Sequence, residues 1–500
     1  MAGYGRRLWI ARLLAAGGLS LLAATTAVAE TQAVTILHDN DLHGHLRAFC
    51  YTETGRRAAE RCGVGGAARR ATLIAALKRQ ARTPVLLVDA GDTTTRGPLT
   101  TQYEGMDEIA AMNALGYGLA ALGNNEFKLK DGLDKTDAAG AQADLRRLIA
   151  ASTFPWLCAN VTDPEGRPLE GVKPFVVRRM GRLRVAFLGL TTLKSVRYAQ
   201  TKGLHFQAPE AAALTWVPIA RAQADVVIAL THLGVDQDRK LAKDTRGIDA
   251  IIGGDSHTFL YTPVEETNLD GRRVPIVQDG EFGANLGAFR LTFSRSAGQS
   301  WTLARDSDRL IPVSSHLRSD PRILRLVEGY AHPLDVVVGR LGRIGADPEE
   351  RKRQTAEILS AAWRSAAQVD FGLQPEDTPY EVFRTRRVTR YQIHAILPFH
   401  EDLVIATLKG DALSALRDAP TRPFVGRLHL ASAGSPIDPA QTYRVAMLNA
   451  VAETLGIAAA QDTGVEARDA LEQILARPER SVEGTPADRI VPGRADFSTP

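Results

Sequence analysis

The stretch Val34-Thr35-Ile36-Leu37-His38-Asp39-Asn40-Asp41-Leu42-His43 places an apolar run just before a carboxylate and an imidazole. The apolar run predicts a strand over residues 34–37. On an extended backbone, residues two apart point the same way, so Asp41 and His43 can reach one metal ion from the mouth of a sheet. Alone, an Asp-x-His pair is more typical of a surface turn, and its meaning depends on the rest of the chain.

The chain that follows alternates apolar runs with helical patterns. Strands are expected at residues 84–89, 119–122, 156–161, 183–188, 224–230 and 248–252. Helices are expected at residues 64–79, 106–115, 144–151 and 208–222, and residues 273–293 are β-rich. This order predicts an α/β layered domain that closes near residue 315.

A second unit follows a connecting helix expected at residues 319–330. Its helices are expected at 351–367, 410–417 and 467–476, and its strands at 403–408, 427–431 and 443–447, with a further strand possible at 488–491. The predicted division is a leader at 1–29, an α/β domain at 30–315, a connection at 316–334 and an α+β domain at 335–495.

The first 29 residues resemble a secretory signal peptide. Arg6, Arg7 and Arg12 precede an apolar stretch, and Ala27-Val28-Ala29 is a small-x-small cleavage site. No Cys follows that site directly and no later run reads as a transmembrane helix, so no stable membrane anchor is expected. We expect a periplasmic or secreted protein.

The charge of the chain argues against a nucleic-acid polymer as partner. There are 61 Lys and Arg against 57 Asp and Glu, and three of the arginines lie in the predicted leader, which leaves the remainder nearly neutral. A neutral chain lacks the basic field that polyanions require. We expect a monomer that acts on a small molecule.

The three cysteines predict one disulfide in an exported chain. Cys50 and Cys62 flank a polar loop and form the natural pair. Cys158 lies in an apolar stretch, as a buried free thiol would. A cysteine-based metal site is disfavoured because the thiols are too few and their spacing does not match such sites.

Further predicted strands also end in side chains that bind metals. Ligands of α/β sheets gather beyond the carboxyl ends of strands. The candidate ligands are Asp41, His43, Asp92, Asn124, His232, Asp255 and His257. Mixed nitrogen and oxygen donors without thiolates suit Mn, Fe, Zn or Co, and seven ligands suit two ions that share a bridging carboxylate. Taken singly, Asp92 could cap a helix and Asn124 could turn a loop. The occurrence of such ligands at five strand ends together favours a metal site.

These motifs, in this order, resemble those of the calcineurin-like metallophosphoesterases, in particular the secreted 5′-nucleotidases. The matching segments are Asp-x-His within residues 36–44, Gly-Asp at 91–92, Gly-Asn-x-Glu-Phe at 123–127, residues 158–161, Thr-His-Leu-Gly at 231–234, Gly-x-Ser-His at 254–257, and residues 397–399 and 443–446. The resemblance implies a four-layer-type α/β sandwich followed by an α+β C-terminal domain.

The resemblance also implies a hydrolase with two divalent ions. Asp41, His43, Asp92 and His257 would hold one ion, and Asp92, Asn124, His232 and Asp255 the other, with Asp92 bridging. We expect Mn, with Mg, Zn, Co or Fe as alternatives. Water or hydroxide on the metals would attack the phosphorus of a phosphate ester or nucleotide in line.

The motifs depart from the family at the residues that move protons. Asn125 stands where the family has a catalytic His, and Lys128 where it has the Asp that orients this His. Asn125 and Asn124 remain the catalytic candidates, but an amide donates a hydrogen bond without shuttling a proton. Asp255 stands where the family has a His, which favours Mn or Mg over Zn, or else Asp255 turns away and the second metal is weak.

The C-terminal unit departs from the nucleobase clamp of the family. Phe424 stands at the first aromatic position, as a platform or as core, and Ala450 at the second. Arg384 and Arg386 lie in an Arg-rich segment that either binds an anion or is a solvated face.

Three functions follow: a phosphoesterase, a metal-binding or ligand-binding relative with little catalysis, or a hydrolase of a sulfur-linked anion as in the thiosulfohydrolase branch.

Overall fold

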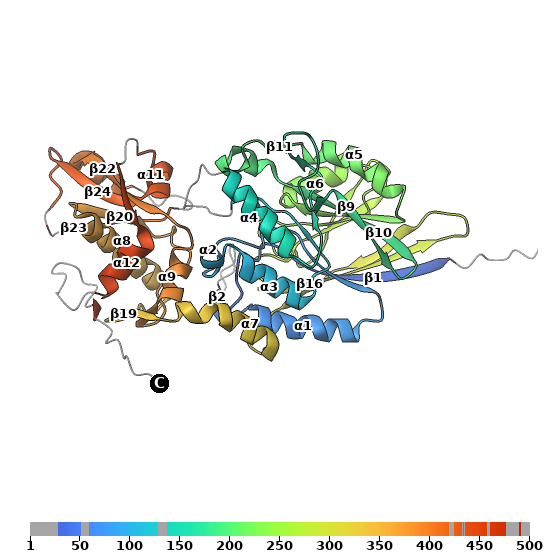
Figure 1. Cartoon of the computed structure of the whole chain (residues 1–500), viewed down its shortest axis with the longest axis horizontal. Coiled ribbons are helices and arrows are strands. Elements are labelled where there is room, and N and C mark those ends of the chain that lie inside the picture. The colour runs from blue at the N-terminus through green and yellow to red at the C-terminus, as the bar shows by residue number, and fades with distance from the viewer. Residues whose placement is uncertain are drawn as a thin grey trace, which may run out of the picture.

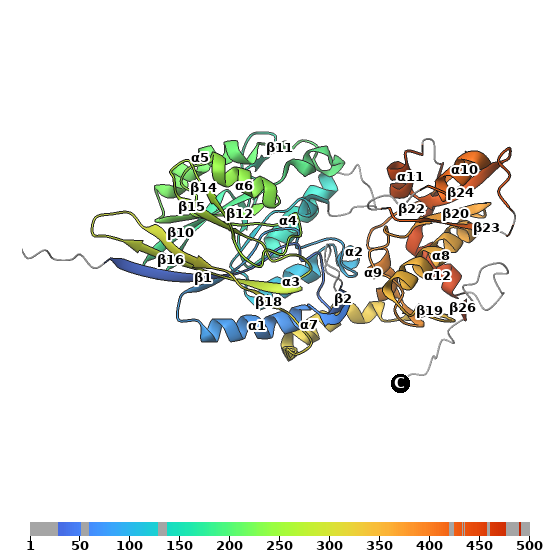
Figure 2. The ribbon, with the colours of Figure 1, turned by 180° about the vertical axis from the view of Figure 1, so that it is seen from behind.

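The computed structural model describes residues 29–51, 60–128, 138–419, 425–432, 434, 436–457, 461–476 and 490–491. The predicted signal peptide lies outside this range apart from Ala29. Figures 1 and 2 show an N-terminal block in blue to yellow beside a smaller C-terminal block in orange and red. Among the described helices, none combines the length and apolar character needed to cross a membrane.

The opening stretch forms β1 (Glu30–Asp39), a central strand of the first sheet. β1 runs parallel to β4 (Val85–Asp89), with Ile36 opposite Leu86, and antiparallel to β16 (Asn285–Arg295). The other strands of this sheet are β5 (Leu119–Ala121), β6 (Trp156–Leu157), β8 (Val172–Lys173), β17 (Thr302–Ser307) and β18 (Leu310–Pro312). The carboxyl ends of β1, β4 and β5 therefore meet at one edge.

A second sheet stacks on the first. Its core is the parallel set β10 (Leu183–Thr191), β12 (Val226–His232) and β13 (Ala250–Ile252). The outer strands are β9 (Phe175–Met180), β14 (Val264–Thr267) and β15 (Arg273–Val277). Ile36 of β1 and Ile228 of β12 belong to the apolar core between the two sheets. The resemblance implies two stacked sheets, and the structure shows which strands belong to each sheet.

Helices cover both outer faces, which makes four layers and confirms the predicted fold class. Leu37 points to the helix side while its neighbour Ile36 points between the sheets, as strand alternation requires. The first sheet is covered by α1 (Ala67–Gln80), α3 (Met106–Leu115), α4 (Ala138–Ala151) and α7 (Pro321–Ala331), and the second by α5 (Pro209–Arg221) and α6 (Val235–Asp244). Shorter elements are α2 (Thr100–Tyr103), η1 (Asn125–Lys128), η2 (Leu193–Arg197), η3 (Ala199–Thr201), η4 (His332–Leu334) and the strand pair β7 (Val161–Thr162) and β11 (His205–Phe206).

A disulfide hairpin stands beside this sandwich. β2 (Phe49–Tyr51) pairs with β3 (Arg61–Val64), and Cys50 is bonded to Cys62, the predicted pair. Cys158 is buried and unpaired among the described residues. Glu60, just before β3, forms ion pairs with Arg351 and Arg384 of the C-terminal block, so the hairpin contacts both parts of the chain.

The C-terminal block has its own core of apolar side chains, which includes the fully buried Trp363. Its larger sheet contains β20 (Phe371–Pro375), β22 (Asp402–Lys409), β23 (Leu428–Ser432), β24 (Thr442–Leu448) and β25 (Gln461–Glu466), and its smaller sheet β19 (Val337–Leu341), β21 (Arg387–Thr389) and β26 (Ile490–Val491). The helices are α8 (Pro348–Ala367), α9 (Arg390–Ile396), α10 (Gly410–Arg417), α11 (Asn449–Leu455) and α12 (Ala467–Ala476). The connecting helix α7 packs on the N-terminal core through Ile323 and Val327, and the exact domain boundaries stay a prediction.

Three expected elements differ from the structure, and one of these is the helix expected at residues 144–151, which begins earlier, at Ala138. The strand expected at residues 156–161 is two short strands, β6 and β7, because the Asn160 side chain pairs with the backbone N–H and carbonyl of Thr191 and draws the chain out of the sheet. The helix expected from residue 64 begins at Ala67, because Val64 pairs in β3 and Gly65 and Gly66 have φ of 69° and 91°.

Candidate metal centre

The candidate ligands gather where strand ends of both sheets face each other. Asp41 follows β1, Asp92 follows β4 and Asn124 follows β5 in the first sheet. His232 ends β12, and Asp255 and His257 follow β13 in the second sheet. The site therefore lies between two sheets rather than at the mouth of one.

The backbone at five of the seven candidate ligands is left-handed, which corrects the expectation of an extended Asp-x-His pair. The φ angles are 51° at Asp41, 44° at His43, 56° at Asp92, 81° at Asp255 and 54° at His257. Such angles cost free energy for residues with a Cβ and cluster at functional sites. Asp41 and His43 thus converge through tight turns beyond the strand, not through strand alternation.

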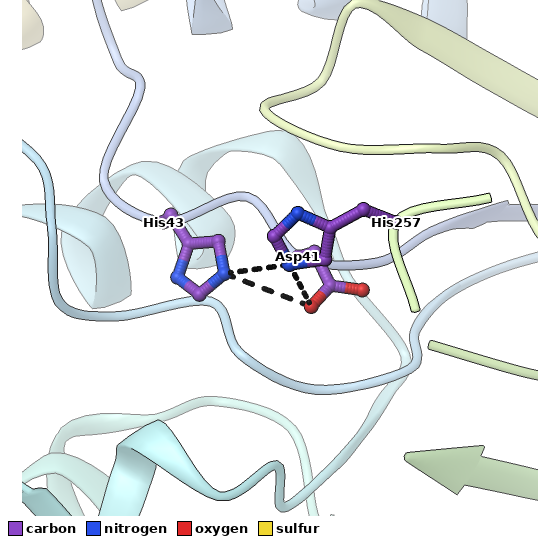
Figure 3. A group of neighbouring side chains, drawn as sticks. All are labelled: Asp41, His43 and His257. Atoms are coloured by element: carbon purple, nitrogen blue, oxygen red, sulfur yellow. Dashed lines mark hydrogen bonds and ion pairs between the residues drawn. The ribbon is translucent and has the colours of Figure 1, made fainter. Parts of the chain in front are cut away.

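The first compact group contains Asp41, His43 and His257 (Figure 3). His257 Nε2 lies 3.2 Å from Asp41 Oδ1 and 3.3 Å from His43 Nε2. His43 Nε2 lies 3.6 Å from the same carboxylate oxygen. Two imidazole nitrogens and one carboxylate oxygen thus surround a single position.

The second compact group contains Asp41, Asp92 and His232. His232 Nε2 lies 3.2 Å from Asp92 Oδ2 and 3.8 Å from Asp41 Oδ1. Asp92 Oδ2 also lies 3.8 Å from His43 Nε2, so that Asp92 faces both groups, as expected of a bridging ligand. Asp41 is nevertheless the residue that the two compact groups share.

Asn124 and Asp255 lie beside the second group. Asp255 Oδ1 is 3.8 Å from His232 Nε2. With its amide turned to satisfy both neighbours, Asn124 donates to Asp255 Oδ1 at 3.1 Å and accepts from Asn125 Nδ2 at 3.1 Å. All seven predicted ligands therefore lie in one cluster, although Asn124 and Asp255 join neither compact group.

Electrostatics favour positive charge between these carboxylates. Burial lowers the pKa of His257, but its contacts with Asp41 and Glu281 outweigh burial and raise the pKa to about 10. The carboxylates of Asp92 and Asp41 likewise hold the pKa of His232 well above its usual value against the effect of burial. Burial and the charge of Arg96 lower the pKa of His43 to about 4. A divalent ion would take the place of the protons that the carboxylates attract.

The residues present fit divalent metals. Asp41 Oδ1 and His232 Nε2 are buried and have no hydrogen-bond partner among the described residues, an arrangement that needs a further ligand. The donors are oxygen and imidazole nitrogen, as Mn and its neighbours prefer. At Gly123 a Cβ would lie 2.1 Å from Asp92 Oδ1, so the small residue leaves room for the carboxylate. The fold and the two ligand groups indicate divalent metals.

Other residues hold the candidate ligands in place. Glu126 accepts hydrogen bonds from the backbone N–H of Asp92, Gly123 and Thr94 and from the Thr94 hydroxyl. Burial and the nearby Asp92 raise its pKa to about 7. Glu281 contacts His257 Nδ1, and His232 Nδ1 lies 2.9 Å from the carbonyl of Ala90. Only Glu126 had a sequence signal, in the Gly-Asn-x-Glu motif; Glu281 lies in a turn whose partner cannot be read from sequence.

Asn125 and Lys128 lie on η1, next to the cluster. Asn125 is buried, and its backbone N–H donates to Asp92 Oδ1 at 2.8 Å while its side-chain amide donates to Asp92 Oδ2. The Lys128 ammonium lies over the Tyr198 ring, 4.1 Å from its centroid. Asn125 therefore supports a ligand directly, and Lys128 binds an aromatic ring that reasoning from sequence did not identify.

The expected substrate contacts in the C-terminal block have partners already. Arg384 pairs with Glu60 and Glu381, and Arg386 donates to the carbonyl of Leu341 at 3.2 Å. Phe424 lies outside the described residues.

Comparisons with known proteins agree with this geometry. Residues 34–259 match the calcineurin-like phosphoesterase family. The chain is 30% identical over 343 residues to a 5′-nucleotidase of Bos taurus, an alignment that covers 65% of this chain and 56% of that protein. The chain thus spans about half the length of the curated relatives it matches.

Two solved structures show the same fold over most of the chain. A 5′-nucleotidase precursor of Thermus thermophilus superposes with a TM-score of 0.69 at 24% identity and covers 89% of this chain and 96% of its own. The sulfate thiohydrolase SoxB of the same species superposes with a TM-score of 0.64 at 19% identity and covers 89% and 95%.

Gly123→Ala tests the packing against Asp92. The new Cβ would lie 2.1 Å from Asp92 Oδ1 and 2.4 Å from Asp92 N, so the carboxylate must move. We expect Mn²⁺ affinity, measured by calorimetric titration, to fall by about tenfold or more. Gly329→Ala is the control, because nothing lies within 4 Å of its Cβ. Equal affinities in both variants would contradict the role of Gly123.

Asp238→Asn tests whether the buried carboxyl group of Asp238, near the end of β12, makes stability depend on pH. Asp238 accepts a hydrogen bond from Thr231 Oγ1 at 2.6 Å. Burial raises the pKa of Asp238 from 3.8, the value of a free carboxyl, to about 8. Between these values the native state binds the extra proton, so the free energy of unfolding falls as pH rises. In Asp238→Asn the urea midpoint should change less between about pH 5 and pH 8. The exposed Asp244→Asn on the same helix should keep the wild-type slope, and an unchanged slope in Asp238→Asn would refute the assignment.

Proposed function

We propose an exported hydrolase of phosphate esters that uses two divalent metal ions, because residues 34–259 match the calcineurin-like phosphoesterase family and the chain has 5′-nucleotidases as relatives. The observation that supports it most is the convergence of three histidines and three carboxylates from two sheets on one buried cluster. The predicted leader peptide supports export. The expected partner is a small phosphate ester or nucleotide, bound by a monomer.

The ligands divide between two positions. One ion would be held by Asp41, His43, Asp92 and His257, and the other by Asp92, Asn124, His232 and Asp255. When bound, two such ions lower the pKa of water and neutralise phosphoryl oxygens. Mn is favoured because Asp255 adds a hard oxygen donor, and Mg, Zn, Co and Fe are the alternatives.

The protein side chains orient the ester and stabilise charge. Arg96 lies beside the cluster, with Nη1 3.4 Å from His43 Nε2, and presents a guanidinium that suits phosphoryl oxygens. Asn125 has its amide on Asp92, so it supports the ligand and offers no proton to a leaving group. Esters with a good leaving group, which leave without a proton, are therefore the expected substrates.

Recognition of the rest of the substrate would fall to the C-terminal block. Arg384 and Arg386 remain proposed contacts, and a substrate anion would compete with Glu60 and Glu381 for Arg384. Phe424 is proposed as an aromatic contact on the sequence alone. These contacts differ enough from a nucleobase clamp that the ester need not be a simple nucleotide.

A second candidate is a hydrolase of a sulfur-linked anion. The shared fold with a protein described as a sulfate thiohydrolase and the absence of a proton-donating residue at Asn125 favour it. A thiolate leaves without protonation, so this chemistry does not need the missing His. The third candidate is a relative that binds metal or ligand with little catalysis.

An activity series separates these candidates. The Mn-loaded full chain is assayed on p-nitrophenyl phosphate, bis-p-nitrophenyl phosphate, AMP, a UDP-sugar and thiosulfate carried on a thiol. We expect turnover of the aryl esters and little turnover of AMP, with Asp92→Ala reduced to background because it removes the bridging ligand. Aryl turnover no higher than that of Asp92→Ala would reject the phosphoesterase, and activity on the sulfur-linked anion alone would establish the second candidate.

Restoring a proton donor gives a sharper test. Asn125→His combined with Lys128→Asp should raise the rate on AMP by about 10²-fold or more and change the rate on p-nitrophenyl phosphate much less, because general acid help matters most for poor leaving groups. Lys128→Asp alone is the control, since it supplies no imidazole. Equal gains on both esters would show that proton donation does not limit the reaction.

A further inference from the structure

Lys194 binds Asp255, the one candidate carboxylate ligand that joins neither compact group. It lies on η2, and its Nζ is 2.8 Å from Oδ1 and 2.7 Å from Oδ2 of Asp255. The Asp255 side chain is 6% exposed, and its backbone N–H donates to Asp41 Oδ2 at 2.9 Å. A nearly buried carboxylate at the cluster is thus held on both oxygens by an ammonium group.

The contact between Lys194 and Asp255 affects only one of the two proposed metal positions, the one at His232. Asp255 Oδ1, which contacts Lys194, is also the oxygen nearest to His232 Nε2 and to the Asn124 amide. At the other position Arg96 Nη1 lies 3.4 Å from His43 Nε2, so a cation is near that position too, but it contacts a neutral imidazole and occupies no carboxylate ligand. The two positions therefore differ in the charge available to a metal.

We propose that Lys194 is a positioning residue that acts through Asp255 to make the two metal positions unequal. The position at Asp41, His43 and His257 binds its ion tightly, and the position at His232 and Asp255 binds its ion weakly. A divalent ion bound by Asp255 would compete with the ammonium for the same two carboxylate oxygens and would be repelled by its like charge. This inference rests on the proposed two-metal function.

Lys194 is free to move when the second ion arrives. Its side chain is 49% exposed and borders an open cleft of about 730 Å³, also lined by Val196, Gln237 and Lys240. The ammonium can rotate into this cleft without disturbing the buried core. Binding of an ion at the weak position therefore breaks the Lys194–Asp255 ion pair and requires no unfolding.

Metal titration of the full chain tests the proposal. Mn²⁺ binding is followed by calorimetry, and electron paramagnetic resonance reports the coupling between two neighbouring Mn²⁺ ions. Wild type should bind two ions with clearly separated affinities. Lys194→Met should tighten the weaker step by about tenfold or more, leave the tighter step within about twofold, and show coupled ions at lower Mn²⁺ concentration.

Lys240→Met is the matched control. Lys240 lines the same cleft, is 56% exposed and pairs with Glu210, so its loss should leave both steps unchanged. Lys194→Arg keeps the charge and should behave like wild type. In an Asp255→His background, which removes the carboxylate that Lys194 holds, Lys194→Met should have no further effect.

The outcomes separate this proposal from the proposed function. Two ions of equal affinity in wild type, or an unchanged weak step in both Lys194→Met and Lys194→Gln, would overturn the role of Lys194 and leave a two-metal hydrolase intact. Failure of the chain and of every variant to bind Mn²⁺ would overturn both.

Discussion

The contacts of Asp41 join the two sheets of the N-terminal block. Its Oδ2 accepts from the Asn40 side chain at 2.7 Å, at the end of β1, and from the backbone N–H of Asp255 at 2.9 Å, beyond β13. Its Oδ1 is the atom that His43, His232 and His257 all face. One carboxylate therefore contacts groups from both sheets at the place where their ligands meet. Losing it would remove the one carboxylate that all three imidazoles face.

This arrangement explains why the ligands sit on turns with left-handed backbone. A side chain at the end of a straight strand points above or below its own sheet, whereas these side chains must point into the gap where two sheets meet. The positive φ angles at Asp41, Asp92 and His257 make that redirection. The strain is offset by hydrogen bonds on the turns: Glu126 accepts from the backbone N–H of Asp92, and the Asn40 side chain donates to Asp41. Precision at the site is thus a property of the supporting groups as much as of the ligands.

Much of this centre was predictable, because its signals are local. An apolar run followed by Asp, His or Asn identifies a strand end, and each of the seven predicted ligands lies in the cluster. The partition of the strands into two sheets was not predictable, since it depends on pairings between distant segments such as β1 with β16. Lys194 and Glu281 were missed for the same reason. Each meets its partner only through the fold, and neither belongs to a recognisable motif.

The disulfide hairpin links the chemistry of the compartment to the assembly of the chain. Cys50 and Cys62 hold the segment that carries Glu60 beside Arg351 and Arg384, which follow it by 291 and 324 residues. Reduction would free Cys62 from Cys50, loosen the placement of Glu60 and weaken its ion pairs with the C-terminal block. An oxidising environment would thus strengthen one of the contacts between the N-terminal and C-terminal parts, because it fixes the hairpin strand that follows Glu60.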